Sequence, residues 1–290
     1  MNHDRIIRCL GTALVVTLVL PVVLTVAVFA QIPHEIANNL PVVIPDPEPK
    51  FDQSLEFGAS LGRYDFDNSS ENSAYDAQFI RYARSRPAVD SWLVDAGRQH
   101  RFDQSSLDLG LGYTRYLGKT GLSAGISGGT NKVLSHEYRI GLGVSHPLAG
   151  FITRLDYTKS QSHGENRSDS WGLGVTRWFS HWILGGGYRF DIGQPGSTES
   201  ASYNFGITYY QWRRTYLGAG VQTGDVSYQL LGPGVPLSSQ VLIDYSAWSA
   251  HLSLMHFISD KSGFNLRYDH SRAQDNWIID GFTCSYFREW

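Results

Sequence analysis

Several short segments contain residue types that act in catalysis or ligand binding. Leu117-Gly118-Lys119-Thr120 resembles the end of a phosphate-binding loop, but five residues separate Gly112 from Gly118 where that loop has four. A predicted strand follows it, so no helix N-terminus would meet a phosphate. Glycines 218, 220 and 224 do not have the dinucleotide-binding spacing either.

His136-Glu137 begins a zinc-protease motif, but Ile140 stands where the second histidine belongs. The ten histidines show no metal-ligand spacing, and no G-x-S-x-G motif occurs. Ser135 and His136 are adjacent, so in a strand they point to opposite faces. The sequence therefore predicts no catalytic residue, no metal site and no cofactor. A serine and a histidine on neighbouring strands could still form a catalytic pair. A lipid hydrolase or acyltransferase is therefore kept as an alternative function.

Charged residues form a second group that could act chemically, as the lining of a channel. They occupy the polar positions of segments in which every other residue is apolar, so they would share one face of a sheet. The candidate lumen-facing charges are Asp95, Asp108, Arg139, Arg154, Asp156, Arg267 and Asp269. Both signs occur, which leaves two interpretations open. Either the charges form a structural salt-bridge network that partly fills the interior, or they line an aqueous path.

The elements that must position these charges are predicted to be β-strands. Leu107, Leu109, Leu111 and Tyr113 alternate with polar or glycine residues. The same alternation appears in residues 138–144, 151–158, 171–176 and 264–269. Aromatic residues end many of these apolar stripes, as in an interfacial girdle, and the strands are about 10–13 residues long, as a tilted membrane crossing requires.

The composition agrees with a membrane β-barrel. The 290 residues include 30 glycines, and 13% are aromatic. A mean hydropathy of -0.23 excludes a bundle of membrane helices but not a barrel, whose strands are apolar on alternate residues only. A net charge of -3 gives no support to nucleic-acid binding.

The connections between strands predict the topology. Tight connections are expected near 118–119, 147–148, 180–181, 213–214 and 260–261. Longer ones are expected near 67–73, 129–134, 160–168, 193–200, 224–240 and 271–276. We predict an all-β fold, a transmembrane antiparallel up-and-down barrel of about fourteen strands, with twelve as an alternative because residues 99–106 and the first two strands give weak signals.

The two ends of the chain carry targeting features. Residues 1–30 read as a signal peptide, with Arg5 and Arg8 before a long apolar run; an uncleaved inner-membrane anchor is the alternative. Residues 31–50 hold five prolines and are predicted to be a proline-rich periplasmic arm, and residues 51–290 the barrel. At the other end, Phe282, Tyr286 and Trp290 share one face of the last strand and are predicted to form the C-terminal assembly signal.

The chain resembles the YaiO-type outer-membrane proteins. The resemblance rests on AGRQHRFDQ (96–104), the following GLGYTRYLGKTGLSAGISGG, RLDYTKS (154–160) and SDSWGLGV (168–175), in that order along most of residues 55–290. It implies an outer-membrane barrel of this strand number and an association with surface polysaccharide. It supplies no reaction and no catalytic residues.

The sequence is compatible with three functions. The first is a porin-like transport or secretion-accessory barrel in the outer membrane of a Gram-negative bacterium, linked through the resemblance to surface polysaccharide. The second is a structural or adhesive surface barrel without an open pore, and the third is the lipid-modifying enzyme. The expected partners are outer-membrane lipid and lipopolysaccharide, the barrel-assembly machinery and a surface polysaccharide or export partner, with no nucleic acid.

Overall fold

A computed structural model describes residues 53–66, 72–101, 103–131, 136–162, 166–194, 198–211, 214–230, 241–273 and 277–290. The predicted signal peptide (1–30) and proline-rich arm (31–50) lie outside the described residues. Within the described part, no helix has the length and apolar character needed to cross a membrane.

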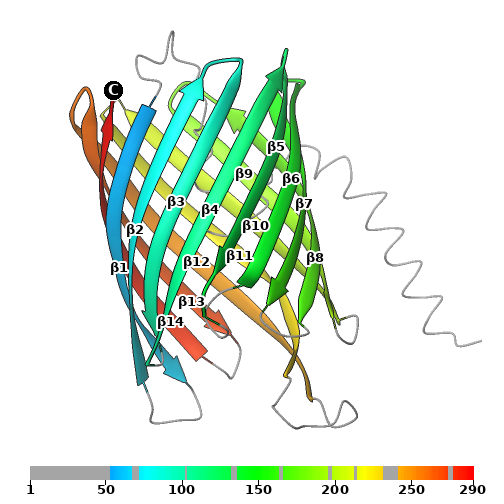
Figure 1. The fold of residues 1–290 in the computed structure, drawn as a ribbon. Coiled ribbons are helices and arrows are strands. Elements are labelled where there is room, and N and C mark those ends of the chain that lie inside the picture. The colour runs from blue at the N-terminus through cyan, green and yellow to red at the C-terminus, as the bar shows by residue number, and fades with distance from the viewer. Residues whose placement is uncertain are drawn as a thin grey trace, which may run out of the picture.

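The described chain forms one closed barrel in which every strand pairs antiparallel with its neighbours in sequence (Figure 1). The predicted strand number of fourteen is confirmed, and the two weak first strands are present and paired. The strands are β1 (Gln53–Phe66), β2 (Asn72–Arg86), β3 (Asp90–Arg101), β4 (Gln104–Leu117), β5 (Thr120–Gly129), β6 (His136–Leu148), β7 (Phe151–Ser162), β8 (Arg167–Trp178), β9 (Trp182–Gln194), β10 (Thr198–Gln211), β11 (Thr215–Leu230), β12 (Val241–Ser259), β13 (Ser262–Ala273) and β14 (Trp277–Glu289).

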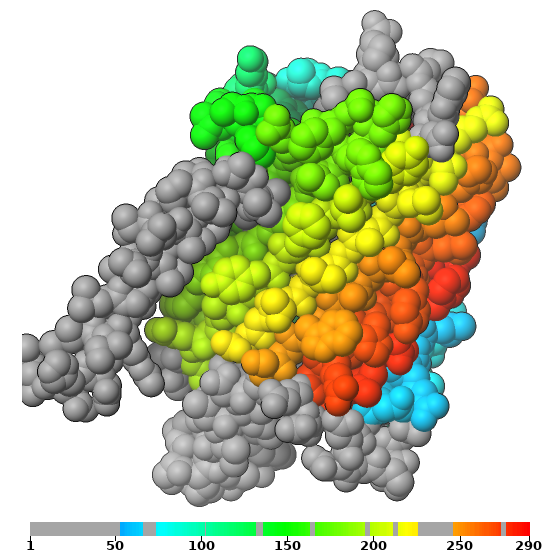
Figure 2. All heavy atoms as spheres, turned by 180° about the vertical axis from the view of Figure 1, so that it is seen from behind, coloured from blue at the N-terminus to red at the C-terminus, as the bar shows by residue number. Residues whose placement is uncertain are grey.

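The outer surface of the barrel is apolar. Leu107, Leu109 and Leu111 of β4 are 50%, 58% and 42% exposed, although each could have been buried in a soluble sheet sandwich. The other predicted apolar stripes also project outward, and their side chains follow the tilted strands over the surface (Figure 2). A closed sheet that exposes so many large apolar side chains is a membrane barrel, because such an area in water would favour aggregation.

At one end of the barrel the described connections are tight turns, at 87–89, 118–119, 149–150, 179–181 and 260–261, while the turn expected at 213–214 lies partly outside the described residues. Outer-membrane barrels direct such turns to the periplasm, so we call this the periplasmic end. The turn expected at 147–148 lies instead at 149–150. Ala149 and Gly150 have φ values of 50° and 83°, and this pair of positive φ angles suits the type I′ hairpin.

The opposite, outer end has shorter connections than the sequence suggested. The pairing of β11 with β12 continues from Gly224 to Leu230, so the connection predicted at 224–240 begins only after Leu230, and residues 231–240 lie outside the described part. The strands likewise continue into the connections expected at 160–168, 193–200 and 271–276. Hydropathy marks the span in contact with lipid, whereas backbone pairing extends beyond it.

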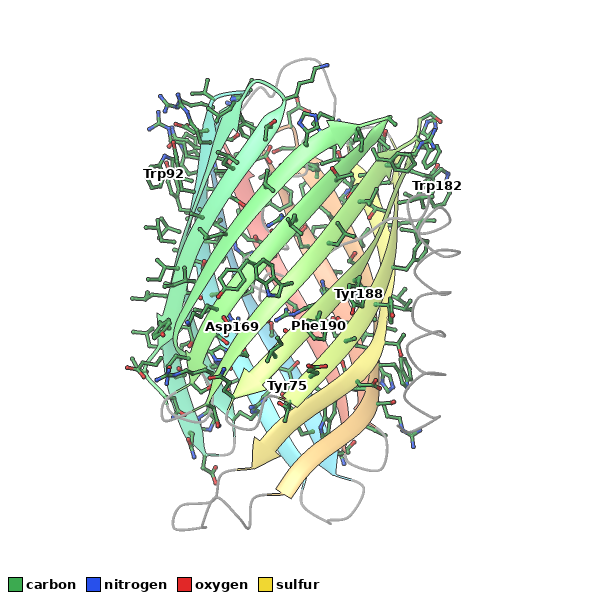
Figure 3. The ribbon with its side chains drawn as sticks, turned by 90° about the vertical axis from the view of Figure 1, so that its right-hand side faces the viewer. Tyr75, Trp92, Asp169, Trp182, Tyr188 and Phe190 are labelled. Carbon is green, nitrogen blue, oxygen red and sulfur yellow. The ribbon has the colours of Figure 1, made fainter. Side chains whose placement is uncertain are left out.

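Aromatic pairs mark the membrane interface at the periplasmic end. The rings of Trp92 and Tyr113 lie 4.4 Å apart and those of Trp182 and Tyr209 4.7 Å apart. Figure 3 shows Trp92 and Trp182 projecting outward on opposite sides of the barrel near the same end. This arrangement is the interfacial girdle of a membrane barrel.

The two ends of the barrel sequence close the sheet at the periplasmic end. The Gln53 amide donates to the Trp290 carbonyl at 3.3 Å, and the Trp290 amide donates to the Gln53 carbonyl at 3.1 Å. Phe282 of β14 is 48% exposed and Trp290 is 43% exposed, both on the outer surface. Their role as an assembly signal stays a prediction.

Candidate functional site

The inner face of the barrel is defined by the strand register. Directly paired residues point to the same side of an antiparallel sheet. Asp108 pairs with Gly97 and Gly129, and none of the three belongs to the stripe that carries the exposed leucines of β4. Applying this rule around the closed barrel places all seven predicted charges on the inner face.

On the inner face, three arginine–aspartate pairs have the same local design. Arg154 Nε donates to Asp156 Oδ1 at 2.7 Å on β7, and Arg267 Nη2 donates to Asp269 Oδ1 at 2.6 Å on β13. The spacing of two residues puts both side chains on one face of a strand, about 7 Å apart at their Cα atoms. The third pair, Arg189–Asp191 on β9, has the same contact at 2.8 Å and was not predicted from the sequence. The repeated Arg-x-Asp spacing could have revealed it.

Glycine connects two of these pairs into one cluster. Asp156 is paired with Gly172 of β8, and Gly172 is paired with Arg189 of β9. Because Gly172 has no side chain, nothing on β8 stands between the carboxylate and the guanidinium. Arg189 Nη2 also donates to Ser170 Oγ at 2.8 Å, and Ser170 in turn donates to Asp191. We call Arg154, Asp156, Ser170, Arg189 and Asp191 the β7–β9 cluster.

A second cluster crosses the closing seam of the barrel. Arg81 of β2 donates to Glu56 of β1 at 2.9 Å, while Asn265 of β13 and Ser285 of β14 donate to the other carboxylate oxygen of Glu56 at 2.9 and 2.5 Å. Glu56 and Arg81 were missed because the first two strands gave weak sequence signals. A single carboxylate with partners on three other strands ties the chain ends together.

The remaining predicted charges lie on β3, β4 and β6. Asp108 accepts from Gln99 Nε2 at 2.9 Å and from Ser106 Oγ at 3.2 Å. Asp95 lies over Gly110, where a Cβ would be only 2.7 Å from its Oδ2 atom. Arg139 Nη2 contacts His136 Nε2 at 2.6 Å. Asp95 is directly paired with Arg81 of the second cluster, whereas Asp108 and Arg139 belong to neither cluster.

Most ionic groups in the three arginine–aspartate pairs are partly accessible to solvent, whereas the Asp156 side chain is only 6% exposed. The side chains of Arg154, Arg189 and Arg267 are each 20–23% exposed, and that of Asp269 is 36% exposed. In a filled protein core, the exposed fraction of such side chains would be near zero. Solvent-sized space therefore reaches the paired charges.

The wall formed by β10, β11 and β12 differs because its described inward side chains carry no fixed charge. Gly206, Gly218 and Gly220 alternate there with hydrogen-bonding residues. We call the latter the neutral wall: Ser202, Asn204, Thr208, Gln222, Ser249, His251 and Ser253. Each of them is partly exposed. Gly220 gives room to the His251 ring, since a Cβ there would be 3.0 Å from its Nε2 atom.

The periplasmic mouth below the neutral wall is aromatic. Ring centroids are 6.3 Å apart for His181 and Tyr210, 6.0 Å for Tyr210 and Tyr216, 6.3 Å for Tyr216 and Phe257, and 4.9 Å for Phe257 and Phe287. We call these five residues the aromatic arc; it runs from the β8–β9 turn to β14. The Tyr210 hydroxyl donates to the Phe179 carbonyl at 3.1 Å, which fixes this ring at the rim.

The described residues contain no group of three or more His, Cys, Asp or Glu side chains that could hold a metal ion. On the outer surface, His100 Nδ1 lies 3.0 Å from Ser105 Oγ, and Asp76 is paired with His100 in the register. The same contact between a hydroxyl and a histidine Nδ1 joins Thr120 to His146 and Thr215 to His256, each at 2.9 Å. His136, singled out in the sequence, contacts Ser162 Oγ of β7 through Nδ1 at 3.3 Å and Arg139 through Nε2 at 2.6 Å, while Ser135 lies outside the described residues.

Comparison with solved structures finds other outer-membrane barrels. The CymD monoaromatic hydrocarbon channel matches with a TM-score of 0.59 and 10% identity, over 83% of this chain and 89% of that one. The TodX deltaS2S3 mutant monoaromatic hydrocarbon channel gives 0.55 and 11%, over 84% and 91%. A bacterial polysaccharide outer membrane secretin gives 0.51 and 11%, over 84% and 100%. At these identities the likeness shows the fold alone.

No curated protein matches the chain. The family model of the Gram-negative porins matches residues 48–228, which is more than half of the sequence. Together with the closed antiparallel barrel and its apolar outer surface, this match places the protein in the outer membrane. The chain belongs to the Gram-negative porin family.

Proposed function

We propose that the protein is a passive outer-membrane channel for small hydrophilic solutes. The observation that carries the proposal is that the three arginines of the arginine–aspartate pairs, with Asp191 and Asp269, remain accessible to solvent although they are paired. A scaffold with a filled interior would bury these groups, whereas a water-filled path explains both their charge and their exposure.

The pairing of the charges also limits ion selectivity. The described inner face carries six arginines against seven acids: Arg81, Arg101, Arg139, Arg154, Arg189 and Arg267, with Glu56, Asp95, Asp108, Asp156, Asp191, Asp269 and Glu289. The net charge of the lining is therefore close to zero. We expect only a weak preference for cations.

The test is planar-bilayer recording with the purified, folded protein. Stepwise conductance is expected, with a reversal potential near zero in a salt gradient of KCl. Folding is checked independently by the changed gel mobility on heating. Folded, inserted protein that passes no current over a wide voltage range contradicts the channel and supports the structural or adhesive alternative.

The substrates of the structural neighbours do not transfer directly. Two of those neighbours, CymD and the TodX mutant, are monoaromatic hydrocarbon channels. A hydrocarbon moving through this barrel would pass the hydrated charges of the β7–β9 cluster, which gives no favourable contact to an apolar solute. The inner face therefore favours hydrophilic solutes.

The resemblance to YaiO-type proteins extends the proposal to secretion of a surface polysaccharide. One structural neighbour is a bacterial polysaccharide outer membrane secretin. Deletion of the gene should then lower the amount of polysaccharide at the cell surface, and the intact gene should restore it. Unchanged polysaccharide would remove this extension while leaving the channel in place.

The second candidate function is hydrolysis or transfer of lipid acyl groups on the outer surface. The contact between Ser105 and His100, with Asp76 adjacent in the register, is the observation that favours it. The two similar threonine–histidine contacts at the periplasmic end argue that such pairs are a recurrent feature of this sheet. Release of fatty acid from labelled phospholipid, lost in Ser105→Ala, would support the enzyme.

A further inference from the structure

The inner face carries two kinds of surface, and only the charged kind explains ion and water passage. The neutral wall lies on β10 to β12, and three residues of the aromatic arc, Tyr210, Tyr216 and Phe257, lie on the same strands at the periplasmic end. Thr208 and Ser253 connect them: both flank Gly218, where a Cβ would be 3.6 Å from the Thr208 hydroxyl oxygen. A solute moving along this wall would meet hydroxyl and amide groups first and rings next.

We infer that this strip is a binding path for neutral carbohydrate. The inference rests on the proposed channel function and names the class of solute that the channel favours. Sugars present C–H groups on the faces of their rings and hydroxyl groups at their edges. Aromatic rings attract the C–H groups through their negative faces, and side-chain hydroxyls and amides exchange hydrogen bonds with the edges.

Other solute classes fit the strip less well. An ion gains little from a wall without fixed charge, and the adjacent β7–β9 cluster offers it paired charges instead. A pure hydrocarbon would leave the hydrogen-bonding groups of Asn204 and Gln222 facing an apolar surface. Only an uncharged molecule with both apolar faces and hydroxyl edges uses the wall and the arc together.

The space beside the arc is open to a solute. Met255 points inward, since it pairs with Tyr216 of β11, and it is nevertheless 36% exposed. The rings of Tyr216 and Phe257 are also partly exposed, while Phe287 is buried against Gly263. Tyr216 and Phe257 are therefore the rings that a sugar would contact.

The experiment is titration of the full-length purified protein with maltohexaose, read out both as block of the bilayer current and as heat of binding in detergent. An uncharged polyethylene glycol of equal hydrodynamic size is the control probe, because it blocks by volume alone. We expect saturable block and binding by maltohexaose and neither saturation nor heat with the polymer.

The variants locate the site. Tyr216→Ala and Phe257→Ala should each raise the half-blocking concentration about threefold to tenfold, in line with the loss of one ring contact. Gln222→Leu, which keeps the size of the side chain, tests the neutral wall without disturbing the rim. Tyr116→Ala is the matched control, since Tyr116 points inward from β4 outside the arc.

The outcomes separate the two proposals. Binding of maltohexaose without any conductance removes the channel but keeps the carbohydrate site. Conductance with no saturable sugar effect, or an equal effect in Tyr116→Ala, overturns the carbohydrate site and keeps the channel. If an arc variant does not fold, Gln222→Leu and the comparison with the polymer still test whether the strip binds carbohydrate.

Discussion

The β7–β9 cluster and the neutral wall are adjacent stretches of the same inner face, yet they make the interior polar with different residue types. The cluster uses full charges held in pairs only two residues apart, with Gly172 clearing the space between them. The neutral wall uses hydroxyl and amide groups beside glycines. A polar lumen in this barrel therefore does not require charged residues. The charges on β7–β9 have a separate role in stability and ion passage.

The largest effect should come from removing one partner of a pair. Asp156→Ala leaves Arg154 with 20% exposure and without its carboxylate. Breaking a fully buried ion pair costs about 3–5 kcal/mol, and access to solvent lowers our expectation to about 2–3 kcal/mol of unfolding free energy. Urea unfolding in lipid vesicles measures it, with Ser253→Ala on the neutral wall as the control at about 1 kcal/mol or less. Equal losses in both variants would erase the distinction between the two walls.

A smaller effect should come from filling the space that glycine leaves beside the cluster. A Cβ on Gly143 would lie 2.6 Å from Ser123 Oγ and still closer to the Asp156 carboxylate. Gly143→Ala should therefore cost about 1–2 kcal/mol through overpacking. Gly141→Ala is matched on the same strand, because its nearest neighbour would be Thr158 Oγ1 at 3.8 Å. We expect Gly141→Ala to be neutral or stabilising by about 0.5 kcal/mol. Equal changes in unfolding free energy for the two variants, measured in the same assay, would contradict the packing argument.

Ion selectivity should also distinguish the two walls. Arg189→Gln removes a positive charge near Asp156 and Asp191, so the channel should become more selective for cations; Asp191→Asn should shift selectivity toward anions. The reversal potential in a KCl gradient measures both, with an expected change of about twofold in the permeability ratio. Gln222→Leu should leave the ratio unchanged, and a shift of similar size there would mean that wall charge does not set selectivity.

The smallest effect is expected on the outer surface. Ser105→Ala removes the hydroxyl that contacts His100 at 3.0 Å, at a cost of about 1 kcal/mol or less in unfolding free energy. We expect channel conductance to stay the same and no lipid hydrolysis by either protein. Hydrolysis by the parent that disappears in the variant would transfer the functional site from the lumen to the lipid-facing surface.

The sequence predicted much of this inner lining. Alternation in the stripe from Leu107 to Tyr113 assigned Asp108 to the face opposite the lipid, because the side-chain period of a strand is two. It could not pair residues that are far apart in sequence. Glu56 and Asn265 meet only because β1 and β14 close the sheet, and this contact spans most of the chain.

By itself, the sequence determined the strand type, the outward stripes and the two-residue spacing of Arg154 with Asp156, since these depend on local geometry alone. The tertiary structure decided the rest: the exact turn at 149–150, the extension of β11 to Leu230, and the meeting of Asp156 with Arg189 across Gly172. Register joins residues on different strands, and it is fixed by backbone hydrogen bonding around the closed sheet rather than by the pattern within any single strand.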